Sequence, residues 1–304
     1  MQFLFPLVGG YMDLEKELKT LRTIEDHRTT SAEKSLRATY RRVLKELREF
    51  LGVKYAELAE NGELTYEILQ RNGEYARFLE EVEQKLNGIT PETSQEIQSL
   101  VEQMYELAYT GMVAAVESTA DLEQLSQELD GLRMVSPEVI KKAVENPVAG
   151  LTLSDTLGRN RREIIYDIKR SIGVGLANGD RMSTMAKRFK DVLQGDYEKS
   201  IRIARTEAHR IREAGHGEAA RDIDKSLQDG VTGVRMVKTW RSMEDSRVRK
   251  TSKANHRKMD GVQVGVDEYF NLGRGIRTLE PGNSGDAAND INCRCYVSYD
   301  LVQK

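Results

Sequence analysis

The chain has 304 residues, of which 39% are hydrophobic and 31% charged, with only five prolines. This composition excludes collagen-like, mucin-like and wholly disordered proteins, and the length predicts about two domains with enough chain for a core. Aromatic residues make up 6%, which argues against a large all-β barrel. We find no apolar run long enough to span a membrane.

The net charge of −3 conceals an uneven distribution. Residues 1–150 contain 17 Lys and Arg against 27 Asp and Glu, a net charge of −10. Residues 151–304 contain 29 against 22, a net charge of +7. The two halves are therefore expected to have different tasks, and the basic half is the better candidate for contact with nucleic acid.

The first twelve residues are apolar but lack the basic start of a secretory signal. We interpret residues 1–12 as an arm, or as an over-extended start with Met12 as the true initiator. The two cysteines are two residues apart and give no disulfide framework, so a reducing cytoplasm is the expected compartment for assembly.

Helical periodicity dominates residues 13–150. A helix is predicted over 13–51, because apolar residues recur at intervals of three and four: Leu36, Tyr40, Val43, Leu47 and Phe50. Residues 63–86 are again helical and are bounded by Asn-Gly turns. A long helix is expected from Pro91, with Thr90 as its N-cap, as far as Asp130-Gly131. We expect an extended acidic helical module over 13–150.

The main boundary is predicted near 148–153, after a short helix that Ser136-Pro137 opens and Asn146-Pro147 closes. Three helices follow, over 154–177, 182–193 and 197–227. A small α+β lobe is expected over 231–304, with strands around Val234–Trp240 and at the chain end. The predicted fold is mostly α, with an extended helical N-terminal module and a basic C-terminal domain, 151–304, that adds this lobe to its helices.

A basic stripe is predicted on the third of these helices. Its members are spaced three, four, three and four residues apart and fall within one arc: Arg202, Arg205, His209, Arg212 and His216. The functional interpretation is non-specific contact with double-stranded DNA phosphates, and the alternative is a solvated basic face. Glu207 projects to the flank, where it is expected to pair with a neighbouring arginine or to cap the lobe.

A candidate metal site consists of His256, Cys293 and Cys295, three ligands that suit zinc. In a strand, residues two apart face the same way, so both thiols are expected to point at one metal. Asp245, Asp290, His209 or water is left as the fourth ligand. The alternative is a pair of small buried thiols with a hydrogen-bonded histidine. Trp240 is predicted to pack in the core of the lobe.

An enzymatic interpretation uses Asp245 and His256 with nearby arginines as a metal-dependent nuclease. The required partners are incomplete, because the sequence has no H-N-H pattern, P-loop or nucleophile elbow. The favoured prediction is therefore a protein that is not an enzyme, in which Asp245 has a structural role.

Residues of about 170–300 resemble the phage Mu F-like minor head proteins, also called head morphogenesis proteins. The resemblance rests on the order of several segments: GLANGDRMSTMAKRFKDVL, IRIARTEAHRIREAG, KTWRSMEDSRVR, His256 with Met-Asp-Gly261, DEYF270, Glu280-Pro-Gly and the terminal NCRC. One departure is KTSKAN between Arg249 and His256, which is longer than the usual link. A longer link would place His256 differently relative to the cysteines.

The resemblance implies a virion protein inside the capsid, assembled in the host cytoplasm, with the portal protein and the major capsid protein as partners. It also implies a role in head assembly, DNA packaging or ejection. The charge split suggests that the acidic half docks on portal or capsid and the basic half holds DNA. A pure assembly protein without DNA contact is the further alternative, and the acidic helices are compatible with self-association.

Overall fold

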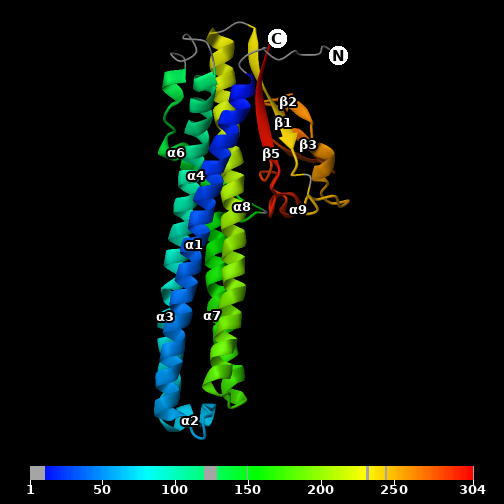
Figure 1. Cartoon of the computed structure of the whole chain (residues 1–304). Coiled ribbons are helices and arrows are strands. Elements are labelled where there is room, and N and C mark those ends of the chain that lie inside the picture. Colours follow the sequence, from blue (N-terminus) through cyan, green and yellow to red (C-terminus); the bar gives the residue numbers. More distant parts are fainter. Residues whose placement is uncertain (1–10, 120–128, 149, 231–232, 244, 304) are drawn as a thin grey trace. The chain divides into compact units, whose positions relative to one another are not determined.

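A computed structural model describes residues 11–119, 129–148, 150–230, 233–243 and 245–303 (Figure 1). The helices are α1 (Tyr11–Leu58), α2 (Tyr66–Arg71), α3 (Tyr75–Asn87), α4 (Ile89–Thr119), α6 (Pro137–Glu145), α7 (Leu153–Ala177), α8 (Met182–Gly230) and α9 (Ala287–Asp290). Short 3₁₀ turns are η1 (Asp130–Leu132) and η2 (His256–Met259). The strands are β1 (Val234–Arg241), β2 (Gln263–Gly265), β3 (Phe270–Gly273), β4 (Ile276–Thr278) and β5 (Tyr296–Gln303).

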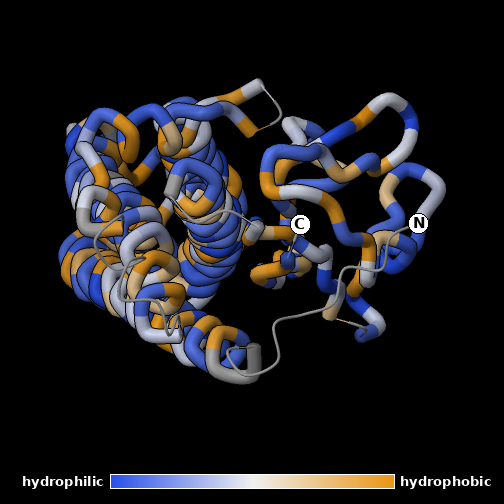
Figure 2. Tube along the Cα trace, turned by 90° about the horizontal axis from the view of Figure 1, so that it is seen from above, coloured by the Kyte–Doolittle hydropathy of each residue, from blue (hydrophilic) through white to orange (hydrophobic). Residues whose placement is uncertain are grey.

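One compact unit, here called the helical unit, comprises residues 31–98 and 154–203. Its interior is an apolar cluster to which α1, α3, α7 and α8 contribute; its members include Val43, Leu47, Phe78, Ile168 and Phe189. The apolar face predicted in α1 is buried, with Leu36 to Phe50 as expected. Hydrophobic and hydrophilic positions alternate around the helices, which is the pattern of amphipathic packing (Figure 2).

The second compact unit, here called the mixed unit, comprises residues 1–30, 99–153 and 204–304. It contains the predicted α+β lobe. A three-stranded antiparallel sheet has the order β2-β1-β5, and β3 pairs with β4 in a separate hairpin. β1 and β5 pair along their whole lengths, from Val234 opposite Gln303 to Arg241 opposite Tyr296. Mostly helical structure with small sheets near the C-terminus confirms the predicted fold class.

Several predicted boundaries differ from those observed. The helices expected over 182–193 and 197–227 are one helix, α8, because Gly195 lowers helix propensity without breaking the hydrogen-bond ladder. Thr90 is not an N-cap, since α4 already begins at Ile89. Ser136 does cap α6, accepting from the Val139 amide. The predicted helical run through Leu122 and Leu125 falls on residues 120–128, outside the described residues.

The division into compact units cuts the chain after Leu153, beside the boundary predicted near 148–153, and also after Thr30, Gln98 and Ile203. Each unit combines segments from both sides of the predicted boundary. Long helices that pack side by side bring distant parts of the chain together, so a linear change in composition is a poor guide to compactness here. No described helix is both long enough and apolar enough to cross a membrane.

Candidate metal centre and the basic face of α8

His256, Cys293 and Cys295 meet in the interior of the mixed unit. All three are buried, and both sulfur atoms lie 3.5 Å from His256 Nδ1. The cysteines lie in the segment just before β5. The prediction that they lie within the strand itself was wrong. His256 opens η2, and its backbone amide donates to the carbonyl of Arg249 at 3.0 Å. The longer link at KTSKAN therefore does not remove His256 from the cysteines.

The orientation of the His256 ring is set on its far side. Nε2 lies 3.0 Å from Asn289 Oδ1. The Asn289 side-chain amide donates to Asp286 Oδ2 at 2.8 Å, which leaves Asn289 Oδ1 as the acceptor toward His256. Nε2 thus carries the proton, and the Nδ1 lone pair faces the two thiols. A histidine held by an outer hydrogen bond in this way is typical of metal ligands.

The pKa values of the two thiols are shifted in opposite directions. Hydrogen bonding to Cys295, together with burial, raises the pKa of Cys293. The pKa of Cys295 is lowered, because the Cys293 thiol donates to it and the nearby Trp240 indole favours its charged form. Cys295 is therefore the sulfur that more readily becomes a thiolate, the form in which cysteine binds metals.

The ligand atoms of these three residues all lie within 4.8 Å of one another, so the group could bind a metal such as zinc. Trp240 closes one side of the site. It is fully buried and packs edge-to-face on His256 at 5.4 Å and on Phe270 at 5.2 Å between ring centroids. Trp240 is thus core, as predicted.

The predicted basic stripe on α8 is not continuously exposed. Arg202 and Arg205 are exposed, whereas His209 and His216 are buried. Arg212 is largely covered and pairs with Asp26 at 3.0 Å and with Glu213 at 3.2 Å. The expectation of five phosphate-facing side chains is corrected in its geometry: within the stripe, the exposed basic groups are Arg202 and Arg205. Whether those two contact DNA stays a prediction.

These side chains are covered because both the lobe and α1 pack against this part of α8. Glu213, which is fully buried, accepts from the Val297 amide of β5 at 3.1 Å. Thr206 accepts from the amide of Asn292 at 3.3 Å. His216 Nε2 lies 2.8 Å from Glu25 of α1. Helical periodicity predicts that the side chains from Arg202 to His216 share one arc, but it could not tell whether water or protein covers that arc.

The two acidic residues singled out from the sequence have structural contacts. Glu207 pairs with Arg210 at 2.8 Å, which is one of the two roles expected of it. Asp245 accepts from Arg294 at 2.5 Å and from the backbone amide of Arg247 at 2.9 Å. These contacts lower the pKa of Asp245, first through the hydrogen bond from Arg294. Asp290 bonds Ser284 and is not within the three-residue metal group.

Sequence reasoning missed the groups that hold the site. Asn289 and Asp286 precede the cysteine pair by a few residues, and an Asp-x-x-Asn spacing at a short helix start was the available signal. Glu213 and Glu25 gave no signal, because a buried glutamate within a charged helix has the same local pattern as an exposed one.

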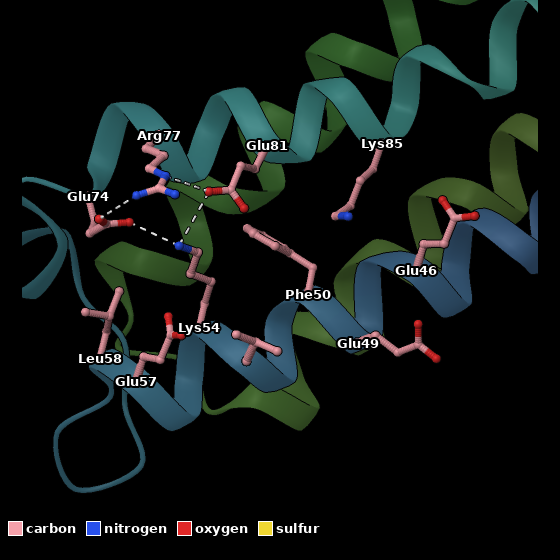
Figure 3. Close-up of a pocket in the computed structure, with 11 residues that line it drawn as sticks. Glu46, Glu49, Phe50, Lys54, Glu57, Leu58, Glu74, Arg77, Glu81 and Lys85 are labelled. Atoms are coloured by element: carbon pink, nitrogen blue, oxygen red, sulfur yellow. Dashed lines mark hydrogen bonds and ion pairs between the residues drawn. The ribbon is translucent and has the colours of Figure 1, made fainter.

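A surface cleft of about 520 Å³ in the helical unit is lined mainly by charged side chains (Figure 3). Four of its charged side chains pair with one another: Lys54 with Glu74 and Glu81, and Arg77 with the same two glutamates. Phe50 lies beside these pairs (Figure 3). These four charges are thus satisfied by one another, and Glu46 and Glu49 pair with Arg42 and Lys45 beside the cleft.

Comparison with known proteins identifies the family. The phage Mu protein F-like family matches residues 166–298, so the chain carries a Mu F-like domain. Minor head protein GP7 of Bacillus phage SPP1 is 31% identical over 274 residues, which cover 90% of this chain and 83% of GP7. The chain therefore belongs to the phage minor head proteins, as the resemblance predicted, and is associated with the virion.

A second relative has a different name. The NAD(+)–arginine ADP-ribosyltransferase EFV of Enterococcus faecalis (strain ATCC 700802 / V583) is 28% identical over 286 residues. The match covers 93% of this chain but 54% of EFV. Because both matches cover nine-tenths of this chain, the stretch similar to EFV is largely the stretch similar to GP7.

Proposed function

We propose that the protein is a non-enzymatic minor head protein that associates with the portal or the inner capsid wall and contacts packaged DNA. The observation that carries this proposal is the similarity to GP7 over nine-tenths of the chain. Contact with DNA is supported by the net charge of +7 on residues 151–304 and by the exposed Arg202 and Arg205.

The absence of enzymatic activity is supported by the state of the candidate residues. Asp245 is engaged by Arg294 and Arg247, and His256 is buried against the cysteines and Trp240. EFV is named as a transferase, but this chain matches only 54% of its length. We propose that the segment of EFV that matches this chain is a minor head protein domain.

The DNA proposal is tested by measuring the affinity of the full chain for double-stranded DNA over a range of salt concentrations. Arg202→Gln/Arg205→Gln is expected to weaken binding equally for all sequences and to reduce the salt slope by about 2, since each phosphate that is no longer neutralised lowers it by about one. Arg41→Gln/Arg48→Gln is the matched control, because both arginines are exposed on α1 in the acidic half.

The control pair should bind as the wild type does. Equal binding by both double variants would reject Arg202 and Arg205 as the contacts. No retention of DNA by the wild type at low salt would favour a pure assembly protein. Portal association is tested separately, by co-purification of the full chain with portal protein and with major capsid protein.

A further inference from the structure

We propose that His256 Nδ1 and the Cys293 and Cys295 thiolates hold a structural zinc ion, and that Trp240 and His209 each donate an N–H group to one of the two thiolates. Neither the family nor its relatives' names assign a metal to this protein. The proposal does not depend on DNA contact or on portal association.

The spacing of the three ligand atoms is the first argument. Zinc binds sulfur at about 2.3 Å and imidazole nitrogen at about 2.0 Å, usually with tetrahedral angles, so two such ligands on one zinc ion must lie about 3.5 Å apart. Both sulfur atoms lie 3.5 Å from His256 Nδ1. The chain thus positions each sulfur at the distance from the imidazole nitrogen that a tetrahedral zinc site requires, with the two sulfurs within 4.8 Å of each other.

Two unpartnered buried nitrogens are the second argument. Among the described residues, Trp240 Nε1 and His209 Nε2 are buried and form no hydrogen bond of normal geometry. The Trp240 indole contributes to the lowered pKa of Cys295, and the His209 ring opposes the raised pKa of Cys293, so each ring is near one thiol. Each sulfur therefore has one buried N–H group beside it. Leaving such donors without acceptors is costly, and a metal-bound thiolate is an acceptor that would satisfy them.

The tautomer of His209 decides between a ligand and a donor. Arg212 lies 3.2 Å from His209 Nδ1, and arginine can only donate. Nδ1 must then accept, so a neutral His209 ring carries its proton on Nε2. A protonated Nε2 cannot bind zinc, whereas it can donate to the Cys293 thiolate. His209 is therefore a positioning residue here and not the fourth ligand.

The fourth coordination position falls to water. Within the described part of the chain, the group that could hold a metal has three members, and neither Asp245 nor Asp290 belongs to it. Three protein ligands with a water molecule are also found in catalytic zinc sites. Here the three ligands, Trp240 and His209 are all buried, which favours a structural role that ties η2 to the segment before β5.

The first experiment is elemental analysis of the full chain purified under reducing conditions, followed by replacement of the metal with cobalt(II). About one zinc per chain is expected, and the cobalt form should show the absorption of tetrahedral thiolate coordination. Cys293→Ser/Cys295→Ser should abolish both signals. A wild type without zinc that also gives no cobalt spectrum would overturn the proposal, and so would zinc retained by the serine variant.

The donor role is tested with His209→Phe, which keeps a ring but removes the N–H group. Zinc affinity should fall by about 10–100-fold and the sulfur-to-cobalt absorption should shift, while about one metal per chain is still bound. His216→Phe is the matched control. It removes another buried imidazole from α8, seven residues further on, that pairs with Glu25 and not with a sulfur. Equal zinc affinities and cobalt spectra for the two variants would reject His209 as the donor.

Discussion

The helical unit and the mixed unit bury different kinds of side chain. The interior of the helical unit is an apolar cluster, and its buried charged groups among the described residues are Lys54 and Asp196. The mixed unit buries Glu25, Glu213, His216 and Glu280 beneath its lobe. Apolar packing tolerates small adjustments, whereas buried charges need a partner at each position. The two units should therefore respond differently to substitution and to pH.

The largest expected effect is in the mixed unit. Glu213→Gln removes the charge that faces Arg212 at 3.2 Å and should lower the free energy of unfolding by about 3–5 kcal/mol at pH 7. Burial alone would raise the pKa of Glu213, but attraction to Arg212, His209 and His216 outweighs it, so this pKa is lowered. The stabilisation is thus present at neutral pH and is lost as the pH falls through this lowered pKa.

Urea unfolding at several pH values measures this effect. The control is Glu198→Gln, which changes an exposed glutamate on the same helix and should cost less than about 0.5 kcal/mol. Equal losses for the two variants would show that the charge of Glu213 is not needed to hold the lobe.

A cavity in the helical unit should lower the free energy of unfolding by about as much as Glu213→Gln does, or slightly less. This loss should not depend on pH. Leu47→Ala, at a fully buried position, is expected to lower the free energy of unfolding by about 2–5 kcal/mol. Between pH 5 and 8 the loss should be constant, since no charge is involved. Val53→Ala on the same helix is exposed and serves as the control. A strong pH dependence for Leu47→Ala would contradict the apolar description of this interior.

The smallest expected effect is that of Asp196→Asn. This substitution should stabilise the protein, whereas Glu213→Gln should destabilise it. Burial raises the pKa of Asp196 to about 6, despite the hydrogen bond from Tyr40. A carboxyl with a raised pKa costs stability as the pH rises from its ordinary value of 3.8 to about 6. Asp196→Asn should therefore stabilise the protein by about 1–3 kcal/mol at pH 7 and by almost nothing below pH 4.

The measurement is urea unfolding of Asp196→Asn and the wild type at pH 4 and pH 7. Asp191→Asn, at an exposed position of the same helix, should show no such difference. A stability gain that is equal at both pH values would mean that the hydrogen bonds of Asp196, and not its charge, determine the effect.

Sequence patterns predicted the helices well because one periodicity determines both structure and burial. Leu36 to Phe50 occupy the face of α1 that the spacing indicated. The same reasoning failed at His209, Arg212 and His216, since an arc of charged residues is compatible with water or with a docked lobe. Arg212 and His216 are covered by Asp26 and Glu25 of α1, more than 180 residues away along the chain, and the local pattern carries no information about them.

The candidate metal ligands could be predicted from the sequence, but the residues that orient them could not. Residue chemistry selected His256 and the two cysteines, and the structure brings them together. Placement of the thiols within a strand was wrong, although they converge as expected. The Asp-x-x-Asn spacing indicates a helix start at Asp286 but not the role of Asn289, which depends on a 3.0 Å approach across the fold to Nε2 of His256.

The pairing of β5 with β1 has a consequence for the order of events during synthesis. Arg22 of α1 also donates to the Val297 carbonyl of β5, across 275 positions of sequence. While a ribosome is still making the chain, Glu213 and the central strand β1 have emerged without the strand that covers them. Contacts between residues so far apart form slowly, and unpaired strand edges promote aggregation in the meantime. The nascent protein is therefore most vulnerable just before β5 leaves the ribosome.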